Sequence, residues 1–196
     1  MLEARDLACR RGERVVFAGL SFTLAARGAL LLTGANGAGK SSLLRLLAGL
    51  LPVAEGTLLW QGEDALADRA LHARRLRYVG HGDALKPALT ARENLAFFAR
   101  LHGGAVEPAL AALGLSALAE LPARVLSAGQ KRRLGLARLA LAPAPLWLLD
   151  EPTTGLDASS VERLGVLLAR HRAAGGMVVA ATHLPLPLPQ AAELRL

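Results

Sequence analysis

The feature that most constrains this chain is a glycine-rich segment, GANGAGKS, at residues 34–41. It matches the pattern G-x-x-x-x-G-K-[ST], and its surroundings fit: the apolar run 29–33 predicts a buried strand before it, and residues 41–50 predict a helix after it. In such a strand–loop–helix unit, backbone N–H groups converge on phosphate groups, and the helix dipole favours their negative charge. The segment therefore predicts a binding site for nucleotide phosphates.

The chemistry of phosphoryl transfer assigns roles within and beyond this loop. Lys40 is expected to reach the β- and γ-phosphates, and the Ser41 hydroxyl to bind Mg²⁺. Asp150 ends the apolar run LWLL and is the predicted acidic partner for Mg²⁺, while Glu151 follows it as the predicted general base for the attacking water. The predicted nucleotide-binding residues of the loop are Gly34, Ala35, Asn36, Gly37, Ala38, Gly39, Lys40, Ser41 and Ser42.

Buried strands alternate with helices over most of the chain. Apolar runs at 29–33, 146–149 and 177–181 predict strands, and helical patterns at 129–142 and 158–174 precede the last two. This alternation predicts a parallel sheet covered by helices on both faces, with polar residues collecting at the carboxyl ends of its strands. The fold class is therefore α/β, with a mostly parallel core sheet.

The rest of the chain adds two features to that core. Residues 90–124 show Ala and Leu at helical spacing, which predicts a helical subdomain inserted between two parts of the core. No linker separates independent units, so residues 1–196 are expected to form a single domain. Short segments in the N-terminal third predict an antiparallel β-layer; they are residues 2–7, 14–17, 21–24 and 57–60.

Composition raises the question of a membrane span, since 53% of the residues are hydrophobic and the mean hydropathy is +0.35. The longest stretch without a formal charge, residues 173–192, contains three prolines and the pair Gly175–Gly176, so a buried strand followed by a loop is favoured over a spanning helix. The N-terminus lacks the apolar region of a signal peptide, which predicts a cytoplasmic protein. The single Cys9 leaves no internal disulfide and no cysteine cluster for a metal.

A second motif narrows the family. Residues 126–130 read LSAGQ, and KRRLGLARLALA follows. Ser127 is expected to cap the helix that follows, and its hydroxyl, with the Gly129 N–H, would form an anion site. The segment resembles the LSGGQ signature of ATP-binding-cassette (ABC) ATPases, with Ala128 in place of the first glycine. The resemblance implies that Leu126, Ser127, Ala128, Gly129 and Gln130 contact the γ-phosphate bound to a second copy of the chain, so that ATP is sandwiched in a dimer.

This resemblance covers nearly the whole chain and implies the P-loop NTPase fold of ABC ATPases, with ATP and Mg²⁺ as cofactors. Asp157 falls in the loop that crosses the dimer interface in the family, and His183 matches its switch histidine, which contacts the γ-phosphate. Two positions depart from the family. His81 replaces a glutamine that senses the γ-phosphate and Mg²⁺, so His81 is a predicted metal residue beside Ser41 and Asp150. Arg11 stands where an aromatic residue often stacks on adenine, and it is a predicted nucleotide-binding residue because a guanidinium can stack as well.

Within the ABC ATPases the chain is most similar to the ATP-binding subunit of the haem exporter of cytochrome c maturation. That similarity implies membrane-spanning partner subunits, a peripheral position on the inner face of the cell membrane, and ATP hydrolysis that drives haem delivery through release of a haem-loaded chaperone. No C-x-x-C-H motif is present, and no direct haem site is expected. The net charge of +7 then fits phosphate binding and an anionic membrane face rather than nucleic acid.

Other functions remain open at this point. The nearest alternative is the ATPase subunit of another exporter, for a drug, a lipid or a small molecule. A soluble ABC ATPase acting on nucleic acid or ribosomes is less favoured, because the interval between Lys40 and Ser127 shows no sustained heptads and the chain holds one cassette. A GTPase or kinase is disfavoured because neither class uses a motif like LSAGQ, and the N-K-x-D motif that binds guanine is absent.

Overall fold

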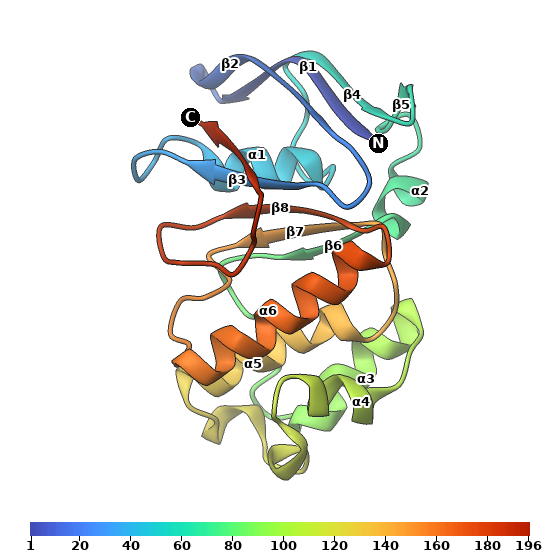
Figure 1. Ribbon diagram of the computed structural model, residues 1–196, viewed down its shortest axis with the longest axis vertical. Coiled ribbons are helices and arrows are strands. Elements are labelled where there is room, and N and C mark those ends of the chain that lie inside the picture. Colours follow the sequence, from blue (N-terminus) through green and yellow to red (C-terminus); the bar gives the residue numbers. More distant parts are fainter.

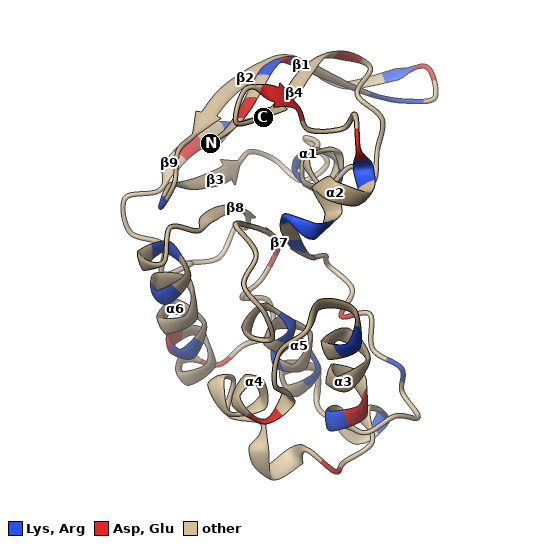
Figure 2. Cartoon of the chain, turned by 90° about the vertical axis from the view of Figure 1, so that its right-hand side faces the viewer, with Lys and Arg blue, Asp and Glu red and all other residues tan.

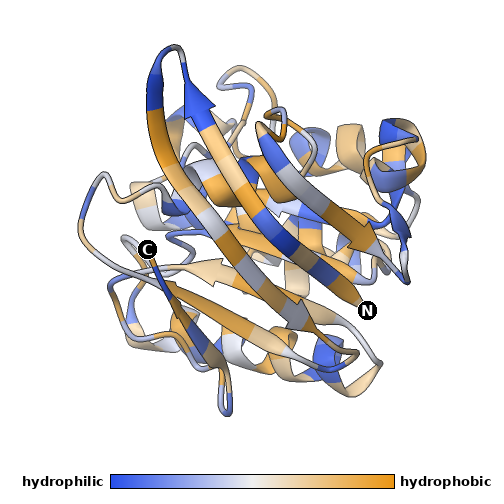
Figure 3. Ribbon diagram, turned by 90° about the horizontal axis from the view of Figure 1, so that it is seen from above, coloured by the Kyte–Doolittle hydropathy of each residue, from blue (hydrophilic) through white to orange (hydrophobic).

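Two β-sheets and the helices are stacked in layers in the computed structural model, which describes residues 1–196 (Figure 1). The upper layer is an antiparallel sheet in the order β2-β1-β4-β5. Seen from above, its strands carry alternating bands of hydrophobic and hydrophilic residues, as a sheet with one covered face requires (Figure 3). These strands are β1 (Leu2–Arg11), β2 (Arg14–Leu24), β4 (Glu55–Trp60) and β5 (Glu63–Asp64).

The middle layer is a five-stranded sheet in the order β6-β7-β8-β3-β9, in which every pair of neighbours is parallel. The carboxyl ends of β3, β7 and β8 therefore lie along one edge of the sheet, where the phosphate loop follows β3, Asp150 ends β7 and Thr182 follows β8. The strands are β3 (Ala29–Thr33), β6 (Leu76–Val79), β7 (Leu146–Asp150), β8 (Met177–Ala181) and β9 (Ala192–Arg195).

The helices cover both faces of the parallel sheet. Helix α1 lies between the two sheets, and its four leucines are fully buried because it is covered on both sides. The other helices, α2 apart, lie on the opposite face, and Figure 2 marks basic residues on α3, α5 and α6. The helices are α1 (Lys40–Leu47), α2 (Arg69–Arg74), α3 (Ala91–His102), α4 (Val106–Ala112), η1 (Ser116–Leu118), η2 (Ala123–Val125), α5 (Ala128–Ala137), η3 (Arg138–Ala140) and α6 (Ala158–Ala173).

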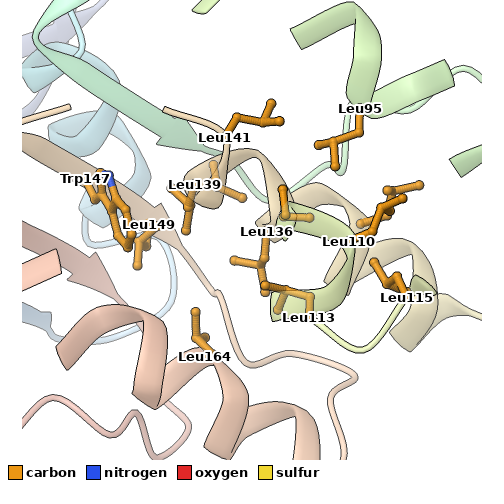
Figure 4. Close-up of a cluster of buried hydrophobic side chains, with 14 of the residues drawn as sticks. Leu95, Leu110, Leu113, Leu115, Leu136, Leu139, Leu141, Trp147, Leu149 and Leu164 are labelled. Carbon is orange, nitrogen blue, oxygen red and sulfur yellow. The ribbon is translucent and has the colours of Figure 1, made fainter. Parts of the chain in front are cut away.

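Two hydrophobic clusters lie on opposite sides of the parallel sheet, because successive side chains of a strand point to opposite faces. Leu146 and Leu148 of β7 face α1 and the antiparallel sheet, whereas Trp147 and Leu149 face α5 and α6. In the second cluster Leu136 lies between β7 and the leucines of the segment α3–η2, which is called the helical insert below (Figure 4). One continuous core thus joins the insert to the sheet.

The predicted α/β class with a parallel core sheet and an N-terminal antiparallel layer is confirmed. Some details differ. The segments 14–17 and 21–24 form one strand, β2, and the edge strands β6 and β9 were not predicted. The stretch 173–192 does hold a buried strand, β8, followed by a loop. None of the helices combines the length and the apolar character needed to cross a bilayer.

Candidate functional site

The phosphate loop joins β3 to α1 and depends on its glycines. Gly34, Gly37 and Gly39 have φ values of 130°, 83° and 109°, in the region that side chains with a Cβ rarely adopt. At Gly39 space is also limiting, since a Cβ there would lie 2.7 Å from Val16 Cγ1 on β2. The conformation of the loop therefore depends on these three glycines.

Lys40 is buried at the centre of this loop. Its Nζ donates hydrogen bonds to the carbonyl oxygens of Gly34 and Ala35, at 2.8 and 3.0 Å. These bonds hold the ammonium group beneath the loop, in contact with the turn whose N–H groups are expected to bind phosphate. A positive charge is thus fixed at the start of α1.

A cavity of about 290 Å³ opens beside the loop. Of the residues predicted to bind nucleotide, Gly34, Ala35 and Ala38 do not line this cavity, whereas Arg11 does. Arg14 also lines it, and sequence reasoning missed this residue; Arg11 and Arg14 form the last pair of the β1–β2 ladder, so the hairpin brings both guanidinium groups to one place. The lining residues are Arg11, Arg14, Val16, Asn36, Gly37, Gly39, Lys40, Ser41, Ser42 and Glu151.

The predicted magnesium ligands Ser41 and Asp150 meet at the floor of the site. Ser41 Oγ donates a hydrogen bond of 3.0 Å to Asp150 Oδ1, and the other carboxylate oxygen, Oδ2, is buried without a partner. A hydroxyl beside a carboxylate with an unused oxygen fits Mg²⁺, which proteins bind through one or two such groups together with substrate phosphates and water. No cluster of three His, Cys, Asp or Glu side chains is found, so the phosphates would supply further ligands.

Glu151 follows Asp150 in an unusual conformation. Its φ of 50° is in the left-handed region, which costs energy for a residue with a side chain. Its Oε1 lies 2.8 Å from His183 Nδ1, within hydrogen-bond distance, and its Oε2 is buried without a partner. The loop after β8 is shaped by Thr182, whose hydroxyl exchanges hydrogen bonds with the main chain of Leu184. The structure thus brings the predicted general base, Glu151, together with His183, which is predicted to contact the γ-phosphate.

A second cavity, of about 190 Å³, lies on the other side of Glu151. His81 lines this cavity and not the one that contains Ser41, so the structure does not bring His81 to the predicted magnesium ligands. Glu151 borders both cavities. The residues that line the second cavity are His81, Asp83, Ala128, Arg132, Glu151, Thr154 and Gly155.

The segment LSAGQ begins α5. Ser127 is the N-cap residue, as predicted: its Oγ accepts a hydrogen bond from the Gln130 N–H at 3.2 Å, and Gln130 Oε1 accepts one from the Ser127 N–H at 2.8 Å. Leu126 is buried, and none of residues 126–130 lines the cavity beside the phosphate loop. Within one chain, the signature and the phosphate loop are thus separate sites.

Asp157 caps the next helix, α6. Its carboxylate accepts hydrogen bonds from Ser160 and from the Ser159 hydroxyl, at 2.8 and 3.1 Å. These bonds, chiefly those from Ser160, hold the pKa of Asp157 below its ordinary value. The side chain therefore fixes the start of α6 at the end of the loop that carries Gly155.

Comparison with known proteins identifies the family to which the chain belongs. Residues 17–154 match the protein family described as ABC transporter. The chain belongs to the ABC transporter family of ATP-binding proteins. It is 58% identical, over 98% of its length and 92% of the relative's, to the cytochrome c biogenesis ATP-binding export protein CcmA of Paramagnetospirillum magneticum, and 61% identical, over 97% and 83%, to CcmA of Rhodospirillum rubrum.

Solved structures support the same fold. A dimeric ATP-binding cassette in a post-hydrolysis state, bound to ADP and Pi, superposes with a TM-score of 0.83 at 23% identity, covering 94% of this chain and 88% of that one. The predicted ABC ATPase fold is therefore confirmed. Members of this ABC transporter family bind nucleotide and hydrolyse ATP, and the chain is accordingly an ATPase.

A second residue of this ABC ATPase site, Arg132, could not be recognised from the sequence. The Arg132 guanidinium, on α5, is 5% exposed and donates hydrogen bonds to the carbonyl oxygens of Asp150, Glu151 and Gly80 at 2.6, 2.8 and 2.9 Å, and to Asp83 Oδ1 at 3.2 Å. It thereby ties the signature helix to the end of β7 and to the His81 loop. Its place in the basic run KRR offers no signal, because such runs are usually solvent-exposed helix faces.

The structure explains why alanine replaces the first glycine of LSGGQ in this ABC ATPase and why the second glycine is kept. A Cβ at Gly129 would lie 2.7 Å from the carbonyl oxygen of Gly155, in the loop before α6. Ala128 instead faces the second cavity, where its methyl group is accommodated. The glycine that this chain retains is therefore the one that the close approach of two loops requires.

Replacing Gly129 with alanine is expected to push these two loops apart. Overpacking of this kind costs about 1–3 kcal/mol of unfolding free energy, and ATP turnover is expected to fall with it because the signature moves. The matched control is Ala128→Gly, which relieves no clash and costs no more than about 1 kcal/mol of helix propensity. Urea unfolding and phosphate release measure both effects; equal behaviour of the two variants would contradict the steric explanation.

Proposed function

We propose that the chain is the ATP-binding subunit of the exporter that delivers haem for cytochrome c biogenesis. The observation that carries this proposal is the identity of 58–61% with proteins named as cytochrome c biogenesis ATP-binding export proteins, over 97–98% of the chain. ATP hydrolysis would drive haem delivery through release of a haem-loaded chaperone. No haem site is proposed in the chain itself, because it contains no C-x-x-C-H motif.

The reaction would take place between the phosphate loop and Glu151. Lys40 and the loop N–H groups bind the β- and γ-phosphates, and the arginines Arg11 and Arg14 flank the cavity where the nucleotide enters. Ser41 and Asp150 would hold Mg²⁺, which neutralises charge on the phosphates. Glu151 accepts the proton of the attacking water, and His183, which lies within hydrogen-bond distance of Glu151, orients the γ-phosphate.

The site would be completed by a second copy of the chain. Ser127 and Gly129 offer a capped helix N-terminus suited to an anion, but they do not reach the nucleotide cavity of their own chain. A γ-phosphate bound to the partner copy would meet them if two chains pack head to tail, with Asp157 at the interface. The cassette of similar fold whose structure is dimeric supports the proposal of a second copy.

The helical insert would carry the motion to membrane-spanning subunits. It exposes four large hydrophobic side chains, at 42–62% exposure, that no element of this chain covers. These side chains are proposed as part of the contact with the membrane-spanning subunits. The protein would then be cytoplasmic and peripheral on the inner face of the membrane. The exposed residues are Phe97, Leu101, Leu121 and Val125.

The proposal can be tested in cells that lack the chain. We expect such cells to make apocytochrome c without attaching haem, with haem-loaded chaperone retained at the membrane. Wild-type chain restores holocytochrome c, and Lys40→Ala does not, because it cannot bind the phosphates. Affinity purification from detergent-solubilised membranes should recover integral membrane subunits with both forms. Normal holocytochrome c without the chain would contradict the proposal and favour a different exporter.

A further inference from the structure

A small basic cavity lies away from the ATP site, at the edge of the parallel sheet. Its volume is about 160 Å³, and it is bounded by the edge strand β6, the end of α3 and the start of η3. None of its residues lines the nucleotide cavity or the cavity of the signature. Three of the residues that line it are basic, namely Arg77, His102 and Arg138, and the others include Tyr78 and Phe98.

The two arginines are buried and have no acidic partner. Arg77 is 8% exposed and Arg138 is 9% exposed, yet neither takes part in any of the ion pairs of the chain. Buried charges in proteins are normally paired, because an isolated charge loses its hydration without compensation. Asp83 is the one acidic residue that acts on Arg138, and it is already paired with Arg132.

Both guanidinium groups also keep unused donors. Arg77 donates one hydrogen bond, from Nη1 to the Leu76 carbonyl oxygen at 2.9 Å, and its Nε is buried without a partner. Arg138 donates one, from Nε to the Gly135 carbonyl oxygen at 2.8 Å, so that both of its Nη groups remain. Since a guanidinium has five N–H donors, most of the donors in this cavity have no protein acceptor.

The surroundings hold these charges in place rather than dispersing them. The Arg138 guanidinium stacks on the Phe98 ring, with its carbon 4.6 Å from the ring centroid, which fixes its plane. Burial lowers the pKa values of Arg77 and Arg138 from the ordinary value, and burial together with the charges of these two arginines lowers the pKa of His102. The two guanidinium groups stay protonated despite this burial, because arginine is not deprotonated in proteins, so the cavity is positively charged.

We propose that this cavity binds a small oxyanion of the phosphate type. Planar guanidinium groups recognise such anions through paired N–H donors, and a bound anion would satisfy both the charge and the unused donors. The volume is below the range of about 300–1,000 Å³ usual for drug-sized ligands, so a phosphate group fits and a whole nucleotide does not. The phosphate group can come from free inorganic phosphate or from a lipid headgroup.

Binding would connect two parts of the fold. Arg77 lies on β6, which leads into the His81 loop, whereas His102 ends α3 and Arg138 begins η3, directly after α5. An anion held by all three side chains joins the edge of the sheet to the helical insert. It is therefore expected to stabilise the folded protein.

The test is thermal unfolding with increasing inorganic phosphate, at ionic strength held constant with chloride and with MgADP saturating the phosphate loop. We expect phosphate to raise the unfolding temperature of the wild type by several degrees, and to have little effect on Arg77→Met. Without phosphate, Arg77→Met should be at least as stable as the wild type, because it removes an unpaired buried charge. The matched control, Arg74→Met, removes an exposed charge three residues away and should respond to phosphate like the wild type.

A second variant keeps the test decisive if Arg77→Met does not fold. His102→Glu places a carboxylate beside the two arginines, so it should be more stable than the wild type without phosphate and should not respond to it. Equal phosphate responses of the wild type and both variants would overturn the proposal. Phosphatidylglycerol vesicles separate the two sources: sedimentation that depends on Arg77 assigns a lipid headgroup, and a phosphate response with sedimentation independent of Arg77 assigns the free anion.

Discussion

Replacing Glu151 with glutamine is expected to lower ATP turnover by about 100- to 10,000-fold, the usual contribution of a general base. The amide has the size of the carboxylate and keeps an oxygen that can accept a hydrogen bond from His183, so the 2.8 Å contact can persist. It cannot take the proton of the attacking water. MgATP should therefore still bind and accumulate in a dimer, which size-exclusion chromatography with ATP detects alongside phosphate release.

The control for this variant is Glu162→Gln, which makes the same chemical change at an exposed position on α6. We expect its turnover to equal that of the wild type. Turnover of Glu151→Gln within a few fold of the wild type would remove Glu151 as the base. A joint loss of turnover and of nucleotide binding would instead assign Glu151 a structural role at the wall between the two cavities.

Replacing Arg132 with methionine should release the main chain that carries the catalytic carboxylate. The hydrogen bonds from Arg132 to the carbonyl oxygens of Asp150 and Glu151 hold Glu151 in its strained left-handed conformation, with a φ of 50°. Because hydrogen bonds from charged groups contribute about 1.5–3 kcal/mol each, their joint loss should lower the free energy of unfolding by several kcal/mol. At temperatures where the variant stays folded, kcat should fall at least about tenfold.

Separate measurement of kcat and KM distinguishes loss of the positioning of Glu151 from a general loss of stability. Arg132 does not line the nucleotide cavity, so the KM for MgATP should change little. Arg133→Met is the matched control: Arg133 donates hydrogen bonds to the carbonyl oxygens of Leu113 and Gly114 in the helical insert, so its loss should lower stability with little effect on kcat. Equal losses of kcat in both variants would show that Arg132 has no special role.

In the parallel sheet, the strands buried on both faces could be predicted from the sequence, whereas the strands at the two edges could not. β3, β7 and β8 are short apolar runs, which only a covered parallel sheet explains. β6 contains Arg77, and β9 reads AELR and is mostly exposed, so neither shows an apolar run. Edge strands pair on one side only, and their sequences need not be apolar.

The candidate site was predictable where its residues are neighbours in sequence. The phosphate loop and the pair Asp150–Glu151 depend on local spacing, whereas Arg132 is functional only because α5 packs across the end of β7. The prediction that His81 lies beside Mg²⁺ also depends on packing. Motif order places it near the γ-phosphate, but only the packing of its loop decides which of the two cavities it enters.

The core that joins the helical insert to the sheet limits how this ATPase can move. Leu110, Leu113 and Leu115 of the insert belong to the same buried cluster as Trp147 and Leu149 of β7. A rotation that separated the helical insert from β7 would expose several leucines to water, each at a cost of about 1.5–3 kcal/mol. Sliding along the α5 surface would keep them covered. The energy of one ATP is therefore better matched to a shear of a few ångströms than to a wide swing.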